Sequence, residues 1–200
     1  EVAIFPEWIA FHQSVGFEHF YVYDNGSTDG TVELLARYRE AGIVTVIPWP
    51  HFVEKYHIQS LAYAHALSSF GPDSKWMAFF DADEFFFCPS GEEIKSILSE
   101  RPQVPGFLVF RHTYGRCGHL TKPKGLIIES FLECAAPPAG SFIMQGWLTA
   151  PKSIVQPRHV RATQGSHFFK YRNDPSCGYT ENGEAAFRKG VRQFLSDHAY

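Results

Sequence analysis

Residues 76–84 read Trp76-Met77-Ala78-Phe79-Phe80-Asp81-Ala82-Asp83-Glu84, an apolar run that passes directly into an acidic cluster. The apolar part is typical of a short strand that is buried on both faces of a sheet. Carboxylates crowded this closely repel one another unless a cation or basic partners compensate them. Because Asp81 and Asp83 stand at positions i and i+2 of a strand end, both can reach one hard cation. The segment therefore predicts a buried strand that ends in a cation-binding turn.

The chain before this segment alternates between strand and helix patterns. Strands are predicted at residues 19–24, 44–49 and 75–80, and helices at residues 31–41 and 57–70. This alternation is typical of an α/β fold with a parallel sheet and right-handed crossovers. Such sheets bind ligands at the carboxyl ends of their strands, where Asp24 and Asp81 both stand. We therefore expect these two carboxylates to face one crevice.

The second half of the chain has a different sequence pattern, in which predicted strands are joined by loops rich in Gly and Pro. Ser90 and Glu93 fit a capping box that opens a short helix before Pro102. Strands are predicted at residues 106–111, 126–133 and 153–155, and a helix at residues 181–195. The sequence shows no repeat, low-complexity tract or linker, which favours one domain over residues 1–200.

Composition narrows the class of protein. An apolar content of 44% and a charged content of 20% are those of a soluble globular protein. The net charge of -3 provides no overall basic field, which argues against nucleic acid as a partner. No apolar run approaches the roughly 18 to 20 residues that span a bilayer, so membrane attachment would need a segment absent from this chain. The four cysteines are widely spaced without a Cys-x-x-Cys pair, which argues against structural zinc.

Several motifs together resemble one enzyme family. The run Tyr23-Asp24-Asn25-Gly26-Ser27-Thr28-Asp29-Gly30-Thr31 resembles the second-strand signature of GT-A glycosyltransferases. Further motifs are similar to glycosyltransferase family 92, and they occur in the same order over residues 1–167. They are residues 7–12 with Gly16, Gln59, residues 75–85, the loop at residues 114–119, and residues 152–157 with the later Gly165-Ser166-His167.

The resemblance implies a fold and an activity. The fold would be GT-A-like (Rossmann-like), a mostly parallel sheet flanked by helices with a smaller antiparallel acceptor-side region, and its first strand would be missing before Glu1. Residues 1–105 would form the nucleotide-sugar half, residues 106–170 the metal and acceptor half, and residues 171–200 a C-terminal extension. The activity would be inverting transfer of a sugar, with galactose the first to test, from a UDP-sugar to a glycan hydroxyl. Mn²⁺ or Mg²⁺ would be the cofactor. The compartment would be the Golgi lumen, with a membrane anchor, in a eukaryote and the cytoplasm in a bacterium.

The resemblance also assigns residues to the donor site. Asp24 would lie against the base or ribose, Asp81 near the ribose or the metal, and Asp83 would be the main metal ligand. His167 matches a late histidine that completes the metal site in many relatives. The remaining nucleotide-sugar positions are Asn25, Ser27, Gln59 and Ala82.

An inverting transfer needs a base that takes the proton of the acceptor hydroxyl. Glu129 and Glu133 are the candidates, because residues i and i+4 of the predicted strand share a face. Glu129 is the first choice and Glu84 an alternative. His119 and Trp147 are candidate acceptor-binding residues, since an aromatic face suits the C–H side of a sugar. Loop solvation of His119 and core burial of Trp147 are the competing interpretations.

Two other functions fit parts of the sequence. One is a non-catalytic carbohydrate-binding or scaffold domain derived from a transferase, against which the intact Asp81 and Asp83 pair argues. The other is a metal-dependent nucleotidyltransferase or hydrolase, which would also use paired acids on a phosphate. The turn at residues 24–30 favours the transferase, as does the lack of a Gly-rich phosphate loop with Lys.

Overall fold

The computed structural model describes residues 2–50, 58–88, 90–134, 151–180 and 183–186. The chain divides into two compact units, which we call the N-terminal unit (residues 1–73 and 80–102) and the C-terminal unit (residues 74–79 and 103–200). None of the helices in the described residues combines the length and apolar content that crossing a bilayer requires.

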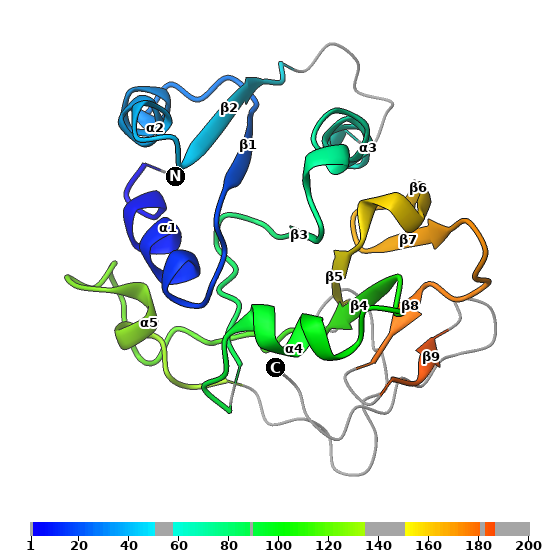
Figure 1. Cartoon of the computed structure of the whole chain (residues 1–200). Coiled ribbons are helices and arrows are strands. Elements are labelled where there is room, and N and C mark those ends of the chain that lie inside the picture. The colour runs from blue at the N-terminus through cyan, green and yellow to red at the C-terminus, as the bar shows by residue number, and fades with distance from the viewer. Residues whose placement is uncertain (1, 51–57, 89, 135–150, 181–182, 187–200) are drawn as a thin grey trace. The chain divides into compact units, whose positions relative to one another are not determined.

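The N-terminal unit is built on two parallel strands and their connecting helix (Figure 1). Strand β1 pairs with β2 in parallel, from Phe20 opposite Val44 to Asp24 opposite Pro48. The predicted strands and helices of residues 19–70 are confirmed, and their ends differ from the predicted ones by no more than one residue. In chain order the elements are α1 (Phe5–Ser14), β1 (Phe20–Asp24), α2 (Thr31–Glu40), β2 (Val44–Pro48), α3 (Ile58–Ser69), the 3₁₀ turn η1 (Gly71–Asp73) and α4 (Ile94–Glu100).

Local chemistry explains where α2 begins. Gly30 has a φ of +87°, a left-handed conformation that glycine adopts without steric cost. The Asp29 carboxylate accepts hydrogen bonds from the Thr31 backbone N–H at 3.1 Å and the Thr31 hydroxyl at 2.6 Å. The apolar face of α2 then packs into the core, where Leu35 meets Ile9 and Val44. The turn after β1 is therefore fixed at both ends, by a strand and by a capped helix.

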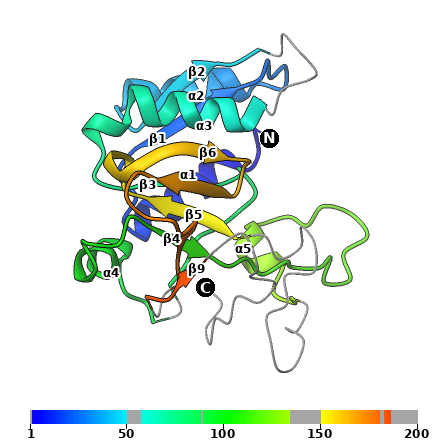
Figure 2. The ribbon, with the colours of Figure 1, turned by 90° about the vertical axis from the view of Figure 1, so that its right-hand side faces the viewer.

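The C-terminal unit contains a five-stranded mixed sheet in the order β3 (Met77–Phe79), β5 (Lys152–Val155), β4 (Gly106–Val109), β8 (Gly178–Tyr179) and β9 (Ala185–Ala186). Strand β5 runs antiparallel to both β3 and β4, whereas β4 and β8 are parallel. Strands β6 (Val160–Gln164) and β7 (Phe168–Tyr171) form an antiparallel hairpin (Figure 2). The short helices are α5 (Ile127–Ser130) and η3 (Pro157–His159).

The predicted α/β class is confirmed, but the main sheet is mixed where a mostly parallel sheet was predicted. Only β1 and β2 among the described residues follow the predicted parallel arrangement in the first half of the chain. Strand β3 pairs antiparallel with β5, with Met77 opposite Val155. The apolar pattern of residues 75–80 indicates a buried strand correctly. This pattern contains no information about the direction of the partner strand β5, which comes more than 70 residues later in the chain.

The predicted strand at residues 126–133 is wrong over residues 127–130, which form the single helical turn α5. The Ser130 backbone N–H and hydroxyl both donate to the Leu126 carbonyl, at 3.1 and 2.7 Å. These two bonds close a turn that the β-branched pair Ile127 and Ile128 does not favour by itself.

Two further local predictions are wrong. Helix α4 begins at Ile94 after Glu93, without a side-chain cap, and the Ser90 hydroxyl donates instead to the Glu92 carboxylate at 2.8 Å. Within the predicted helix at residues 181–195, Ala185 and Ala186 form β9, because they pair with Gly178 and Tyr179 of β8. The rest of that predicted helix, apart from residues 183 and 184, lies outside the described residues.

Candidate functional site

The acidic turn, residues 81–84, is closed by its own first and last residues. The Asp81 backbone N–H donates to a carboxylate oxygen of Glu84 at 3.0 Å, and the Glu84 N–H donates to the Asp81 carbonyl at 3.1 Å. This reciprocal pair fixes the backbone between the two residues. Asp83 stands in the middle of the turn and is exposed.

Asp81 is also tied to helix α3. The Gln59 side-chain amide donates to Asp81 Oδ1 at 2.6 Å and to the Tyr63 hydroxyl at 2.9 Å. Tyr63 is buried, and this burial raises the pKa of its hydroxyl, so the group stays protonated at neutral pH. Two residues predicted to contact the nucleotide sugar, Gln59 and Asp81, are therefore in direct contact.

The turn after β1 is organised by Asp24. Its two carboxylate oxygens accept hydrogen bonds from the Gly26 and Ser27 backbone N–H groups at 3.2 and 3.1 Å. Hydrogen bonding by the Ser27 side chain, followed by these backbone bonds, lowers the pKa of Asp24. Asp24 is thus ionised and held in place at the carboxyl end of its strand, and Asn25 and Ser27 are exposed beside it.

Trp49 links this turn to the start of α3. Its backbone N–H donates to the Asp24 carbonyl at 2.6 Å, and its indole N–H donates to the Ile58 carbonyl at 3.4 Å. Because Gln59 follows Ile58 directly, the two hydrogen bonds of Trp49, the peptide link from Ile58 to Gln59 and the bond from Gln59 to Asp81 connect the end of β1 to the acidic turn. The N-terminal unit therefore assembles Asp24, Gln59 and Asp81 into one connected polar region.

The carboxylates of the acidic turn fit a hard divalent cation that arrives with a phosphate ligand. Asp83 has no hydrogen-bond or ion-pair partner among the described residues, so its oxygens face solvent. The described part of the chain contains no cluster of three or more metal-ligating side chains. Mg²⁺ and similar ions are commonly held by one or two carboxylates, with water and substrate phosphates completing the coordination. The Ala82 side chain packs against the hydrophobic core of the N-terminal unit.

His167 belongs to the C-terminal unit, between β6 and β7. Its Nδ1–H donates to the Pro151 carbonyl at 3.1 Å, and its own carbonyl accepts from the Ser153 hydroxyl at 2.7 Å. A backbone bond at Nδ1 places the ring lone pair on Nε2, which is the tautomer in which a histidine coordinates a metal through Nε2. The geometry of His167 is therefore compatible with its predicted role.

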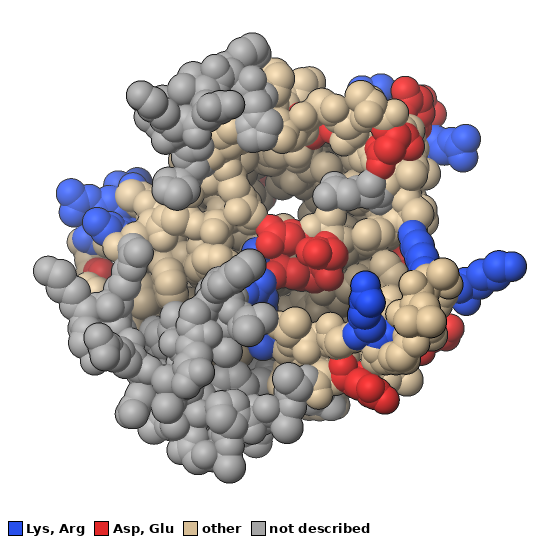
Figure 3. Space-filling model, turned by 180° about the vertical axis from the view of Figure 1, so that it is seen from behind, with Lys and Arg blue, Asp and Glu red and all other residues tan. Residues whose placement is uncertain are grey.

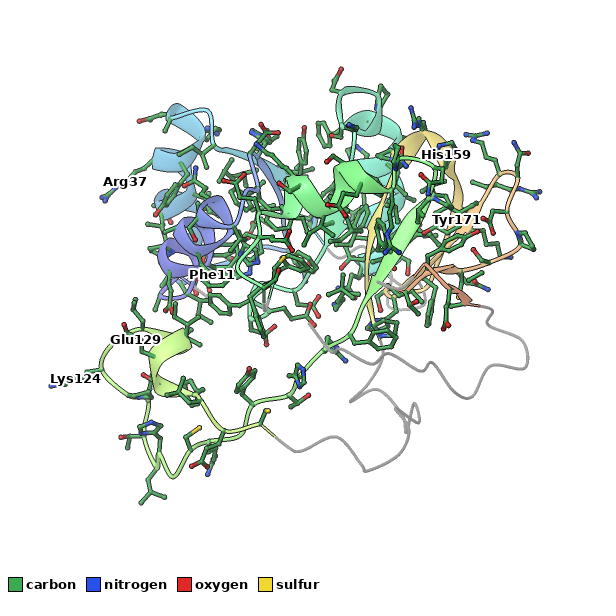
Figure 4. The ribbon with its side chains drawn as sticks, turned by 60° about the horizontal axis from the view of Figure 1, so that its bottom comes forward. Phe11, Arg37, Lys124, Glu129, His159 and Tyr171 are labelled. Atoms are coloured by element: carbon green, nitrogen blue, oxygen red, sulfur yellow. The ribbon has the colours of Figure 1, made fainter. Side chains whose placement is uncertain are left out.

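The predicted base and acceptor residues also belong to the C-terminal unit. Glu129 is exposed on α5 (Figure 4), and Glu133 is exposed three residues beyond that helix, so the two do not share a strand face. His119 donates from Nε2 to the Ser130 carbonyl at 3.1 Å and packs edge-on against Phe131. Its ring thus supports α5. Trp147 lies outside the described residues.

Two residues of the motif at residues 7–12, for which no site role was predicted, hold the acidic turn from α1. Trp8 donates its indole N–H to the Glu84 carbonyl at 2.7 Å. The His12 ring accepts a hydrogen bond from the Phe86 N–H at 3.1 Å and is 1% exposed. Trp8 and His12 are four residues apart and so lie on one face of α1. This spacing is the sequence signal that could have shown that they act together.

Charge on the surface agrees with the small net charge. On the face that Figure 3 shows, Lys and Arg side chains of the described residues stand in several separate places rather than in one continuous patch. A salt bridge joins two exposed side chains, Lys95 and Glu18, at 2.9 Å.

The fold and the acidic turn define an α/β protein with a carboxylate site suited to a hard cation. The family model of glycosyltransferase family 92 matches residues 1–188 of this sequence, so the chain belongs to that family. This result confirms the resemblance that the sequence motifs indicate.

Curated relatives agree with the family. A family 92 protein of Oryza sativa subsp. japonica is 27% identical over 171 residues, which cover 81% of this chain and 28% of the relative. A family 92 protein of Arabidopsis thaliana is 26% identical over 174 residues, covering 80% of this chain and 29% of the relative. A galactan beta-1,4-galactosyltransferase of Arabidopsis thaliana is 33% identical over 109 residues, which are 52% of this chain and 21% of that protein. The chain spans less than a third of the length of these relatives.

Proposed function

We propose that this protein is a metal-dependent, inverting glycosyltransferase that moves a sugar from a UDP-sugar to a glycan hydroxyl. The observation that carries the proposal is the connected polar region of the N-terminal unit. There the ionised Asp24 follows β1, Gln59 holds Asp81, and the exposed Asp83 extends from a turn that Glu84 closes. A nucleotide base or ribose suits the first carboxylate, and a cation with a diphosphate suits the last.

Different residues of the chain would bind the metal and the nucleoside. Asp83 and Asp81 would bind Mn²⁺ or Mg²⁺, and His167 would complete the protein ligands. A bound divalent cation neutralises the diphosphate and so stabilises UDP as it leaves. Gln59 keeps the Asp81 carboxylate in a fixed orientation through its 2.6 Å hydrogen bond. Asp24, Asn25 and Ser27 would hold the nucleoside, with Ala82 close to the same ligand.

Galactose is the first donor sugar to test, because a galactan beta-1,4-galactosyltransferase is among the relatives. The acceptor would then be a glycan, which a panel of oligosaccharides assayed with the full-length protein can identify. A lumenal, membrane-anchored enzyme is the arrangement we propose for a eukaryotic source, and a cytoplasmic one for a bacterial source.

The first prediction tests the metal site. UDP binding measured by calorimetry should require Mn²⁺, and Asp83→Ala should abolish it, because the exposed ligand carboxylate is lost. Glu40→Ala is the matched control, since it removes one exposed carboxylate at the end of α2 and should bind like the wild type. Binding of equal affinity without metal would overturn the metal assignment. Binding of a glycan in the absence of any nucleotide affinity would instead support a carbohydrate-binding domain.

The second prediction concerns the base that takes the proton of the acceptor hydroxyl. Transfer forms a bond from the acceptor oxygen to the anomeric carbon as the bond from that carbon to UDP breaks, and a carboxylate receives the proton. Glu129→Gln should abolish transfer and leave UDP affinity unchanged, because Glu129 is exposed on α5, away from residues 81–84 in the chain. Glu133→Gln is the parallel variant. Normal turnover of Glu129→Gln would assign the role to Glu133 or Glu84.

A further inference from the structure

His12 is the most completely enclosed polar group of α1. Its side chain is 1% exposed, and both ring nitrogens have hydrogen-bond partners. Nδ1 lies 2.8 Å from the Trp8 carbonyl, and Nε2 lies 3.1 Å from the Phe86 backbone nitrogen. A carbonyl can only accept and a backbone N–H can only donate, so the ring must carry its proton on Nδ1. One neutral tautomer alone satisfies both partners.

The ring also packs against both ends of the acidic turn. Phe80, which precedes Asp81, stacks on His12 with ring centroids 5.8 Å apart and an angle of 27°. Phe85, which follows Glu84, stacks with centroids 6.0 Å apart and an angle of 18°. The imidazole therefore touches the residue before the turn and the residue after it.

Trp8 adds a second attachment from the same helix face. Its indole N–H donates to the Glu84 carbonyl at 2.7 Å, one turn before His12 along α1. The two side chains thus bind backbone groups of residues 84 and 86 from one rigid element. Within the turn, Glu84 in turn binds the Asp81 N–H. The backbone on which Asp81 and Asp83 stand is consequently anchored at its exit, and the anchor is made of hydrogen bonds with defined directions.

We propose that Trp8 and His12 are positioning residues that hold the acidic turn in the conformation that binds the cation and the diphosphate. The inference rests on the proposed function, because it assumes that Asp81 and Asp83 bind the metal. A ligand set that consists of few carboxylates depends on the backbone that carries them, since a shift of one side chain is not compensated by others. Groups that orient metal ligands in this way typically change metal affinity by about 10- to 100-fold when they are removed.

The experiment measures Mn²⁺-dependent UDP binding by calorimetry at a temperature where circular dichroism shows every variant folded. His12→Leu removes both hydrogen bonds and should weaken binding by about tenfold. His12→Gln should recover most of the affinity, because its side-chain oxygen can accept from the Phe86 N–H. Trp8→Phe keeps one aromatic ring but loses the bond to Glu84 and part of the buried indole, so it tests the same role should His12→Leu fail to fold.

Ile9→Ala is the matched control for loss of stability. Ile9 is 0% exposed on the same helix and makes no side-chain hydrogen bond, so its truncation destabilises α1 without removing an anchor. We expect Ile9→Ala to bind UDP and Mn²⁺ within twofold of the wild type. If His12→Leu and Trp8→Phe bind as tightly as Ile9→Ala, the positioning role is wrong and the proposed function stands. If the wild type shows no Mn²⁺-dependent UDP binding, the proposed function fails, and this inference fails with it.

Discussion

At the scale of single residues, polar groups in the N-terminal unit are fixed by their hydrogen-bond partners. His12 has one donor and one acceptor facing its two ring nitrogens, so only a neutral ring fits its site. Burial lowers the pKa of His12 from 6.5 to about 4, and the Trp8 carbonyl opposes this shift only in part. A histidine that cannot take a proton in the folded protein makes stability depend on pH.

The third prediction follows from the sign of that shift. The unfolded chain binds a proton at His12 below pH 6.5 and the folded chain does not, so stability falls as pH decreases from 6.5 towards 4. At pH 5 the loss relative to pH 7.5 is roughly 2 kcal/mol from this group. Urea unfolding of the wild type and His12→Gln at both pH values isolates the effect, because the other titrating groups cancel in the difference. Equal pH dependence in the two proteins would contradict it.

At the scale of elements, close packing in the C-terminal unit requires a glycine in β4. A Cβ atom on Gly106 would lie 2.9 Å from Tyr171 Cζ and 3.1 Å from the Ile154 carbonyl oxygen, and it would also collide with the Tyr171 hydroxyl. Tyr171 is 4% exposed on β7 (Figure 4), and its hydroxyl has no hydrogen-bond partner among the described residues. The ring of a β7 residue therefore rests directly on the backbone of β4.

The fourth prediction is that Gly106→Ala destabilises the protein by about 1 to 3 kcal/mol through overpacking. Gly115→Ala is the control, because its Cβ would meet only the Glu133 carbonyl at an ordinary 3.7 Å. Tyr171→Phe removes the colliding hydroxyl without breaking a hydrogen bond within the described residues. The double variant, Gly106→Ala with Tyr171→Phe, should therefore lose less stability than the sum of the losses in the two single variants. Thermal unfolding of the three variants measures this difference. Full additivity would rule out this contact as the cause.

At the scale of the whole molecule, ligand binding should stabilise the chain and reveal which segments take part. A ligand at 100 times its dissociation constant adds about 2.7 kcal/mol to the stability of the state that binds it. The fifth prediction is that Mn²⁺ and UDP together raise the melting temperature by about 5 to 10 °C, whereas neither does so alone. Asp83→Ala should abolish the shift.

Hydrogen exchange in the same samples locates the binding residues. We expect protection at residues 24–30 and 81–86, which form the two turns of the connected polar region. If His167 is a ligand, residues 165–168 should also be protected, and His167→Ala should remove that protection while weakening Mn²⁺ binding. Protection limited to the C-terminal unit would contradict the donor site proposed for the N-terminal unit.

Much of the candidate site could be predicted from sequence because its signals are local. Asp24 and Gly26 predict the turn after β1. Asp81 and Asp83, which follow an apolar strand, predict the acidic turn. Gln59 was included through resemblance, and its bond to Asp81 gives that inclusion a physical reason. Glu129 and Glu133 were paired on a strand face that does not exist, because two hydrogen bonds from Ser130 close α5.

The sequence by itself determined the strands and helices of residues 19–80, the carboxylates at the strand ends and the family. These depend on periodicity, turn residues and motif order, all of which are properties of neighbouring residues. Only the tertiary structure decided that β3 pairs antiparallel with β5, and that Trp8 and His12 hold the acidic turn. Both are contacts between residues far apart in the chain, where pairing is selected by shared burial and by the directions of hydrogen bonds. No local pattern specifies such a partner.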